Sequence, residues 1–87
     1  MKLEVWGASK RDVRCPQCDQ LKAHLDKQYA VYASMDVDDY PHARQELGIR
    51  SIPVAILRND DGSEAGRVVG FSPDKKLAVD AFLEQLG

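Results

Sequence analysis

The sequence predicts an α/β domain in which the elements follow the order β-α-β-α-β-β-α and four strands form one mixed sheet with three helices on its faces. Two observations carry this prediction. Short apolar runs alternate along the chain with segments of helical periodicity. Glycine or proline stands at most boundaries between these segments. A β-α-β unit joins parallel strands by a right-handed crossover, whereas a hairpin adds antiparallel strands, so the sheet should be mixed.

The first half of the chain is expected to supply the parallel part of the sheet. Residues 2–6 (KLEVW) alternate as a strand does and end at Gly7. After a polar loop, a helix is expected from about 16 to 28, because the proline at its start is favourable in a first helical turn. A second strand is expected within 30–37. One face of the helix is expected to comprise Cys18, Leu21, Leu25 and Tyr29.

The second half is expected to supply a helix, a hairpin and a final helix. The helix that begins near Pro41 should stop at Gly48, since glycine is common just after a helix C-terminus. Residues 53–57 (PVAIL) are typical of a strand buried on both faces, and 65–69 return after a turn. The final helix covers 72–87 and is capped by the serine that opens it. Its apolar stripe should comprise Leu77, Ala78, Ala81, Phe82 and Leu86.

Length and composition fit a single domain over residues 1–87. Apolar residues make up 44% of the chain and charged residues 30%, which is ordinary for a soluble globular domain. The net charge is −2 and basic residues are scattered, so no nucleic acid partner is expected. No apolar run approaches the roughly 18 residues that a membrane span needs, and the N-terminus does not resemble a signal peptide. We therefore expect a cytoplasmic monomer without membrane association.

Cys15 and Cys18 are the only cysteines, and they stand at the start of the first predicted helix. Residues i and i+3 of a first turn lie on one face, about 5 to 6 Å apart, which a disulfide can bridge. Free N–H groups and the helix dipole should lower the thiol pKa of Cys15. Cys15 is therefore the expected attacking thiolate, and Cys18 the more buried resolving thiol. Lys10, Arg11 and Arg14 either support this thiolate or are plain solvated charges.

Two structural uses of the cysteine pair are less favourable than redox chemistry. A staple across so short a loop contributes only about 2 kcal/mol, and a lasting disulfide is unusual in a reducing cytoplasm. A zinc site would need His24 and His42, which are separated by 17 residues. Zinc fingers usually place their two histidines about 3 to 5 residues apart. The pattern therefore favours a dithiol that cycles with its disulfide, with no metal.

Together with "GIRSIPVAIL" at 48–57, the Cys-Pro-Gln-Cys motif resembles the thioredoxin/glutaredoxin superfamily, over essentially the whole chain in element order. The resemblance implies a thioredoxin-like fold and thiol–disulfide oxidoreductase activity. It implies that Pro53 follows a cis peptide bond beside the active-site disulfide and that Ile52 pairs with the substrate chain. Alternatively, Pro53 merely begins a strand. The remaining residues expected in the active-site groove are Pro16, Gln17, Gly70 and Phe71, although the Phe71 ring fits the core equally well.

The chain combines features of two branches of this superfamily. The run "VDDYPHARQELGIRSIPVAIL" at 37–57 is similar to thioredoxins, whereas the length is that of a glutaredoxin. Gln17 and Val69 stand where glutaredoxins generally carry tyrosine and one glycine of a pair that helps to bind glutathione. Residues 69–77 resemble NrdH-type redoxins, which reduce ribonucleotide reductase. The chain therefore most resembles small glutaredoxin-sized thioredoxins and NrdH-type redoxins.

The resemblance also implies partners. The substrates would be disulfide-containing proteins, with ribonucleotide reductase as one candidate. No bound cofactor is expected, and an external reductant resets the pair: thioredoxin reductase with NADPH or, if the chain is a glutathione-dependent glutaredoxin, glutathione. A non-catalytic binding subunit is disfavoured by the intact cysteine pair. A disulfide-forming oxidase is disfavoured because such proteins are usually exported.

Two residues of the first strand have open roles. Trp6 either flanks the groove or packs in the core, since tryptophan is usually largely buried. Glu4 and Val5 both lie near the position where many thioredoxins carry a buried acid that accepts a proton from the resolving cysteine. No proton acceptor is assigned.

Overall fold

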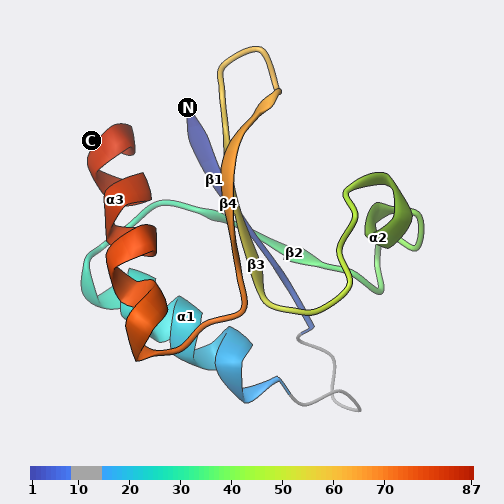
Figure 1. Cartoon of the computed structure of the whole chain (residues 1–87), viewed down its shortest axis with the longest axis horizontal. Coiled ribbons are helices and arrows are strands. Elements are labelled where there is room, and N and C mark those ends of the chain that lie inside the picture. Colours follow the sequence, from blue (N-terminus) through green and yellow to red (C-terminus); the bar gives the residue numbers. More distant parts are fainter. Residues whose placement is uncertain (9–14) are drawn as a thin grey trace.

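The elements of a computed structural model, which describes residues 1–8 and 15–87, follow the expected order (Figure 1). One 3-10 turn, η1, is added before the last helix. The bounds are β1 (Lys2–Gly7), α1 (Pro16–Lys27), β2 (Ala33–Asp36), α2 (Ala43–Glu46), β3 (Val54–Arg58), β4 (Glu64–Val69), η1 (Pro73–Lys75) and α3 (Lys76–Leu86).

The four strands form one mixed sheet in the order β2-β1-β3-β4. β1 runs parallel to β2 and antiparallel to β3, and β3 runs antiparallel to β4. Trp6 pairs with Val54, which in turn pairs with Val69. The end of β1, the start of β3 and the end of β4 therefore meet at one edge of the sheet. The segments that flank these three strand ends are brought together there.

Helices cover both faces of the sheet, as expected. In Figure 1, α1 and α3 lie on the left of the strands and α2 on the right. The core between the sheet and α1 with α3 contains Leu3, Val5, Leu21, Leu25, Ala55, Val68, Phe71 and Val79. The core between the sheet and α2 contains Trp6, Val37, Ala43, Ile49, Val54 and Ile56. We call these two sides the α1/α3 face and the α2 face.

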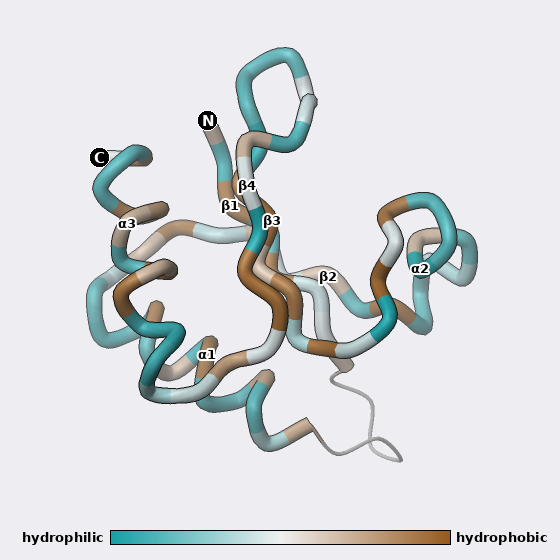
Figure 2. The backbone as a smooth tube through the Cα atoms, in the orientation of Figure 1, coloured by the Kyte–Doolittle hydropathy of each residue, from teal (hydrophilic) through white to brown (hydrophobic). Residues whose placement is uncertain are grey.

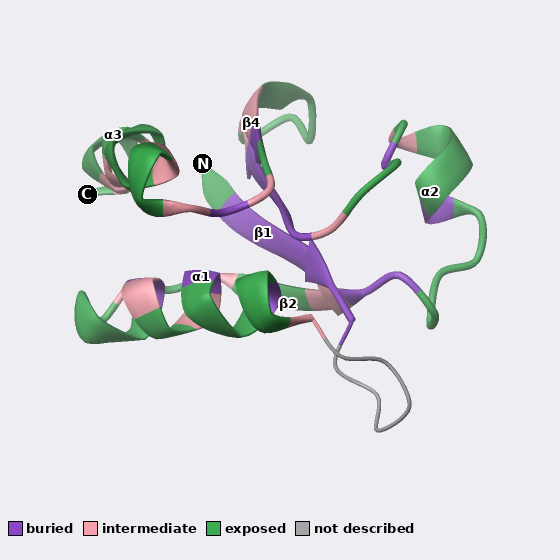
Figure 3. Cartoon of the chain, turned by 60° about the horizontal axis from the view of Figure 1, so that its bottom comes forward, coloured by how far each residue is buried: buried purple, intermediate pink, exposed green. Residues whose placement is uncertain are grey.

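The central strands are the most apolar and most buried part of the molecule. Residues Val54 to Leu57 of β3 are all buried, which confirms the strand buried on both faces. In β1, Leu3 and Val5 point to the α1/α3 face, and Trp6 points to the α2 face. Figure 2 shows hydrophobic colour along β3 and hydrophilic colour along the hairpin that joins β3 to β4. Figure 3 shows most of β1 as buried.

The first two helices agree with the expectation except at their ends. Pro16 is the first residue of α1, and Cys18, Leu21 and Leu25 are buried. Tyr29, however, is 92% exposed and does not belong to this face. It adopts the left-handed conformation (φ 54°) just after the helix ends, which turns the chain and carries its side chain away. α2 is a single turn, and Gly48 follows it with φ +66°, as expected of a C′ glycine.

The final helix begins later than expected and buries a different face. α3 starts at Lys76, and the Ser72 hydroxyl does not cap it but donates a hydrogen bond to the Asp74 carboxylate. Leu77 is 81% exposed, whereas Val79 is fully buried. The sequence contains two overlapping apolar stripes at helical spacing, and the stripe that packs on the sheet is the one that begins at Val79 and not the one that begins at Leu77. Ala78 and Ala81 are also exposed, and the packed residues are Val79, Phe82, Leu83 and Leu86.

Among the helices of the described residues, none combines the length and the apolar character that crossing a membrane requires.

Candidate active site

Three segments that are distant in sequence meet at the edge of the sheet where β1 ends. They are the start of α1 with both cysteines, residues 51–53 before β3, and Gly70 after β4. The Gly70 N–H donates a hydrogen bond of 2.7 Å to the Pro53 carbonyl and so fixes two of these segments to each other. The structure thus brings together the two sequence motifs, as the resemblance implied.

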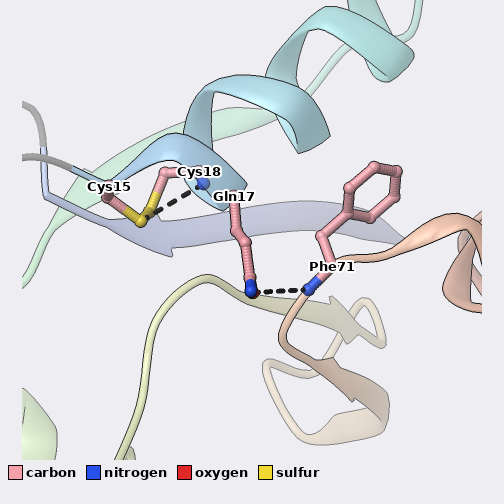
Figure 4. The surroundings of a disulfide bond; sticks show 4 residues. All are labelled: Cys15, Gln17, Cys18 and Phe71. Carbon is pink, nitrogen blue, oxygen red and sulfur yellow. Dashed lines mark hydrogen bonds between the residues drawn. A yellow bond between two sulfur atoms is a disulfide. The ribbon is translucent and has the colours of Figure 1, made fainter.

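Cys15 and Cys18 form a disulfide across the first turn of α1, with their Cα atoms 5.2 Å apart. The spacing agrees with the 5 to 6 Å expected from the sequence. The Cys18 N–H donates a hydrogen bond of 3.2 Å to Cys15 Sγ (Figure 4). Because Cys15 is the N-cap of the helix, its sulfur also lies at the positive end of the helix dipole, which stabilises a negative charge. Both features place partial positive charge beside the Cys15 sulfur.

The two cysteines differ in exposure. Cys15 is partly exposed and lines a groove, whereas Cys18 is only 1% exposed. An external disulfide can therefore reach Cys15 but not Cys18. This is the asymmetry expected of an attacking and a resolving thiol.

A groove of about 400 Å³ lies in front of the disulfide. Besides Cys15, four of the residues expected in the groove line it. Ser51 also lines it, although it was not among the expected groove residues. The lining residues are Cys15, Pro16, Gln17, Ser51, Ile52 and Gly70. The groove thus has one border on α1, one on the segment before β3 and one after β4.

Pro53 and Phe71 lie behind the groove and not on its surface. The Ile52–Pro53 peptide bond is cis, which confirms the expectation, and the Pro53 side chain is fully buried. Phe71 is only 5% exposed and belongs to the core of the α1/α3 face, so of the two positions expected for its ring the core is the one observed. Its backbone N–H nevertheless donates a hydrogen bond of 3.3 Å to Oε1 of Gln17 (Figure 4).

Trp6 and Glu4 belong to the α2 face, on the other side of the sheet from Cys18. Trp6 is buried and contacts the Tyr40 ring edge-on, with centroids 5.6 Å apart, so it packs in the core. Glu4 accepts hydrogen bonds from Trp6 Nε1 at 3.2 Å and from Arg58 Nε at 2.7 Å. Val5 faces the layer that holds Cys18, and Glu4 is therefore not positioned to take a proton from it.

The two histidines lie apart. His24 is on α1 and contacts Asp80 of α3 at 2.8 Å, whereas His42 precedes α2 on the opposite face of the sheet. They cannot join the cysteines in one zinc site. Within residues 1–8 and 15–87, no group of three or more potential ligands is placed to hold a metal ion. Lys10, Arg11 and Arg14, named above as candidate supports for the thiolate, lie outside the described residues.

Comparison with known proteins agrees with this geometry. A family model described as glutaredoxin matches residues 8–60. The SPbeta prophage-derived thioredoxin-like protein YosR of Bacillus subtilis is 31% identical over 72 residues, which cover 83% of this chain and 86% of YosR.

Solved structures show the same fold. Mitochondrial thioredoxin 3 of Saccharomyces cerevisiae superposes with a TM-score of 0.74 at 20% identity, over 95% of this chain and 76% of that one. The NrdH-redoxin of Escherichia coli, described as a glutaredoxin-like protein with a thioredoxin-like activity profile, gives a TM-score of 0.67 at 23% identity. That match covers 91% of this chain and 95% of the NrdH-redoxin.

Proposed function

The chain belongs to the thioredoxin/glutaredoxin superfamily, with a glutaredoxin-type match over residues 8–60, and from this premise we propose that it is a dithiol–disulfide oxidoreductase that donates electrons to protein disulfides. The observation that carries the proposal is the asymmetric pair: Cys15 is accessible in a groove at a helix N-terminus, and Cys18 is buried within bonding reach of it. A disulfide with a purely structural role does not need a sulfur that other molecules can reach.

The first chemical step takes place at Cys15. The Cys15 thiolate attacks one sulfur of the substrate disulfide, and the substrate S–S bond breaks as the mixed disulfide forms. The departing substrate thiolate takes a proton from solvent. The Cys18 N–H and the N-terminus of α1 stabilise the attacking thiolate.

The second step takes place inside the helix turn. Cys18 gives its proton to solvent and attacks Cys15 Sγ, and the S–S bond between Cys15 and the substrate breaks as the 15–18 disulfide forms. The second substrate sulfur leaves as a thiolate and takes a proton from solvent. Two electrons have then passed from the protein to the substrate. Because the Cα atoms are already 5.2 Å apart at the start of a helix, this bond closes with little backbone movement.

The substrate chain would lie along residues 51–52. This border faces Cys15 across the groove, and Ile52 presents a half-buried apolar side chain there. The buried Pro53 and the Gly70 N–H bond hold this segment in place. A protein disulfide that reacts with Cys15 would thus contact this border of the groove.

We further propose that the protein works as a cytoplasmic monomer and that thioredoxin reductase with NADPH restores its dithiol. Ribonucleotide reductase is one candidate among its protein substrates. The match to the NrdH-redoxin, of thioredoxin-like activity profile, and the similarity to the thioredoxin-like YosR support a reductant of the thioredoxin type. No bound cofactor enters the mechanism.

A second candidate function is that of a glutathione-dependent glutaredoxin. The family model that matches residues 8–60 favours it. The residues that differ from the usual glutaredoxin pattern, Gln17 and Val69, disfavour it.

Two coupled assays on the purified protein separate these functions. Each follows the loss of NADPH with insulin as the disulfide substrate. One contains thioredoxin reductase, and the other contains glutathione with glutathione reductase. We expect turnover with thioredoxin reductase. Turnover only with glutathione would establish the second candidate, and turnover in neither assay, together with failure of the chemically reduced protein to reduce insulin, would exclude both.

A further inference from the structure

The side chain of Gln17 joins two borders of the groove. Gln17 lies between the cysteines on α1, and its Oε1 accepts the hydrogen bond from the Phe71 N–H at 3.3 Å. A Cβ atom built on Gly70 would lie 3.6 Å from the same oxygen. In Figure 4 the side chain extends away from the disulfide toward the segment after β4. We call this contact the Gln17–Phe71 bridge.

The segment that receives Gln17 is itself held firmly. Gly70 has φ +75°, which favours glycine, and its N–H is bonded to the Pro53 carbonyl at 2.7 Å. The next N–H, that of Phe71, therefore points from a fixed backbone, and the buried Phe71 ring holds it further. Phe71 does not itself line the groove, but its N–H directly follows the groove residue Gly70, and a fixed backbone N–H is a suitable donor to a ligand carboxylate or carbonyl.

The bridge makes the two ends of the groove unequal. At the end formed by Gly70, Gln17 already occupies the Phe71 donor. At the end formed by Ser51 and Ile52, the hydrogen bonds among residues 1–8 and 15–87 include no such side-chain bridge across the groove. A ligand that needs the Phe71 N–H must first break the Gln17 contact, whereas a chain that docks along residues 51–52 need not.

We propose that Gln17 is a specificity-determining residue, which disfavours small disulfides that bind through a carboxylate at the Gly70 end and so leaves protein disulfides as the better substrates. This inference rests on the proposed oxidoreductase function. A small disulfide makes few contacts, so the loss of one charge-assisted hydrogen bond is a large part of its affinity. A protein disulfide adds contacts along residues 51–52 and is affected less.

The test compares two disulfides that oxidise the reduced protein. Glutathione disulfide is the small carboxylate-bearing probe, and insulin is the protein probe. Rapid quenching by alkylation gives the second-order rate constant for each, and the ratio of the small to the protein probe is the readout. Gln17→Ala and Gln17→Met, which remove the acceptor, should raise this ratio about fivefold, the factor that corresponds to the net contribution of one neutral hydrogen bond.

Two further variants make the comparison specific. Gln17→Glu retains an acceptor for the Phe71 N–H and should keep the ratio low. Gln20→Ala changes an exposed glutamine further along α1 that does not line the groove, and it should leave the ratio unchanged.

An NMR titration reports the bridge directly. S-methylglutathione, which lacks a disulfide, is added to the oxidised protein. The Phe71 amide signal should move in Gln17→Met and stay in place in the wild type, an effect that a merely structural role of Gln17 would not produce.

An unchanged rate ratio in folded Gln17→Ala and Gln17→Met, or an unmoved Phe71 signal in Gln17→Met, would overturn this inference while the proposed function stands. A wild-type protein that reduces neither probe would instead refute the proposed function and the inference together.

Discussion

A methyl group on Gly7 would lie 2.9 Å from Cys18 Sγ and 3.4 Å from its Cβ, so the last residue of β1 leaves the space that the buried sulfur occupies. This close approach allows α1 to place Cys18 against the sheet. We predict that Gly7→Ala lowers the free energy of unfolding of the oxidised protein by about 1 to 3 kcal/mol, because inserting a methyl into a packed core forces neighbouring atoms to move. Urea denaturation measures the change.

A double-mutant cycle tests whether the sulfur is the cause. In a Cys18→Ala background, the Gly7→Ala penalty should shrink to below about 1 kcal/mol, because the nearest atom has been removed. Gly87→Ala is the matched control, since its added methyl would make only an ordinary contact, 3.5 Å from the Leu83 carbonyl. An equal Gly7→Ala penalty with and without the sulfur would contradict the argument.

Single replacements of the cysteines should have different consequences. Cys15→Ser should abolish the reduction of insulin, because the remaining thiol is 1% exposed and cannot reach a substrate. Cys18→Ser should still form the mixed disulfide through Cys15 but should not resolve it. Mass spectrometry of the intact protein after incubation with a disulfide-bonded peptide would reveal the trapped adduct. Full multiple-turnover reduction of protein disulfides by Cys18→Ser would refute the dithiol scheme.

Much of the fold could be predicted from the sequence because local patterns determine it. The apolar run of β3 is buried as a whole, and Gly48 takes the left-handed conformation after α2. The packed face of α3 was predicted wrongly, although Val79, Phe82, Leu83 and Leu86 do recur at the helical spacing i, i+3, i+4 and i+7. A second apolar stripe that begins at Leu77 overlaps with it, and only the contacts with the sheet decide between the two. Tyr29 was wrongly placed on the buried face of α1, because it lies beyond the helix in a left-handed position that glycine usually takes.

Some features of the active site could likewise be predicted from the sequence, and others could not. The unequal exposure of Cys15 and Cys18 follows from their spacing at a helix N-terminus, and this could be predicted. The Gln17–Phe71 bridge joins residues 54 apart, and no periodicity indicates it. The position of Glu4 likewise depends on Arg58, which β3 brings beside it from 54 residues away. Such polar contacts become visible only when the strand register is known.

Breaking the ion pair between Glu4 and Arg58 by removing one partner should cost more stability than breaking an exposed pair does. Both side chains are largely shielded, and Arg58 Nε lies 2.7 Å from Glu4 Oε1. Arg58→Leu would leave the Glu4 carboxylate buried without its partner and should cost about 2 to 3 kcal/mol of unfolding free energy. Replacing both residues by leucine should recover much of this loss, since the buried charge is then also removed.

Arg67→Leu provides the matched control for that experiment. Arg67 bonds Glu64 on β4, where both side chains are more exposed. Its loss should cost less than about 1 kcal/mol, as is usual for surface ion pairs. Urea denaturation at pH 7 measures the loss of unfolding free energy in each single arginine replacement. Similar losses in the two would show that the burial of Glu4 does not increase the destabilisation.

The contact between α1 and α3 should make stability depend on acid pH. Hydrogen bonds from Gln28 and then from His24 hold the pKa of Asp80 below its ordinary value of 3.8. A carboxyl whose pKa is lowered by folding stabilises the protein above its unfolded pKa, and this contribution is lost as the pH falls through the folded pKa. Asp80→Asn should therefore be less stable than the wild type at pH 7, and the difference should shrink below about pH 4.

Urea denaturation of the wild type and Asp80→Asn at pH 7, 4 and 2.5 checks this dependence. Because 39% of the Asp80 side chain is exposed to screening solvent, the difference at pH 7 should stay below about 1 kcal/mol. Glu84→Gln, which changes an exposed carboxylate one turn further along α3, is the control and should change stability little at any of these pH values. If the Asp80→Asn difference stays constant from pH 7 to 2.5, it arises from lost packing or hydrogen-bond geometry and not from the ionised carboxylate.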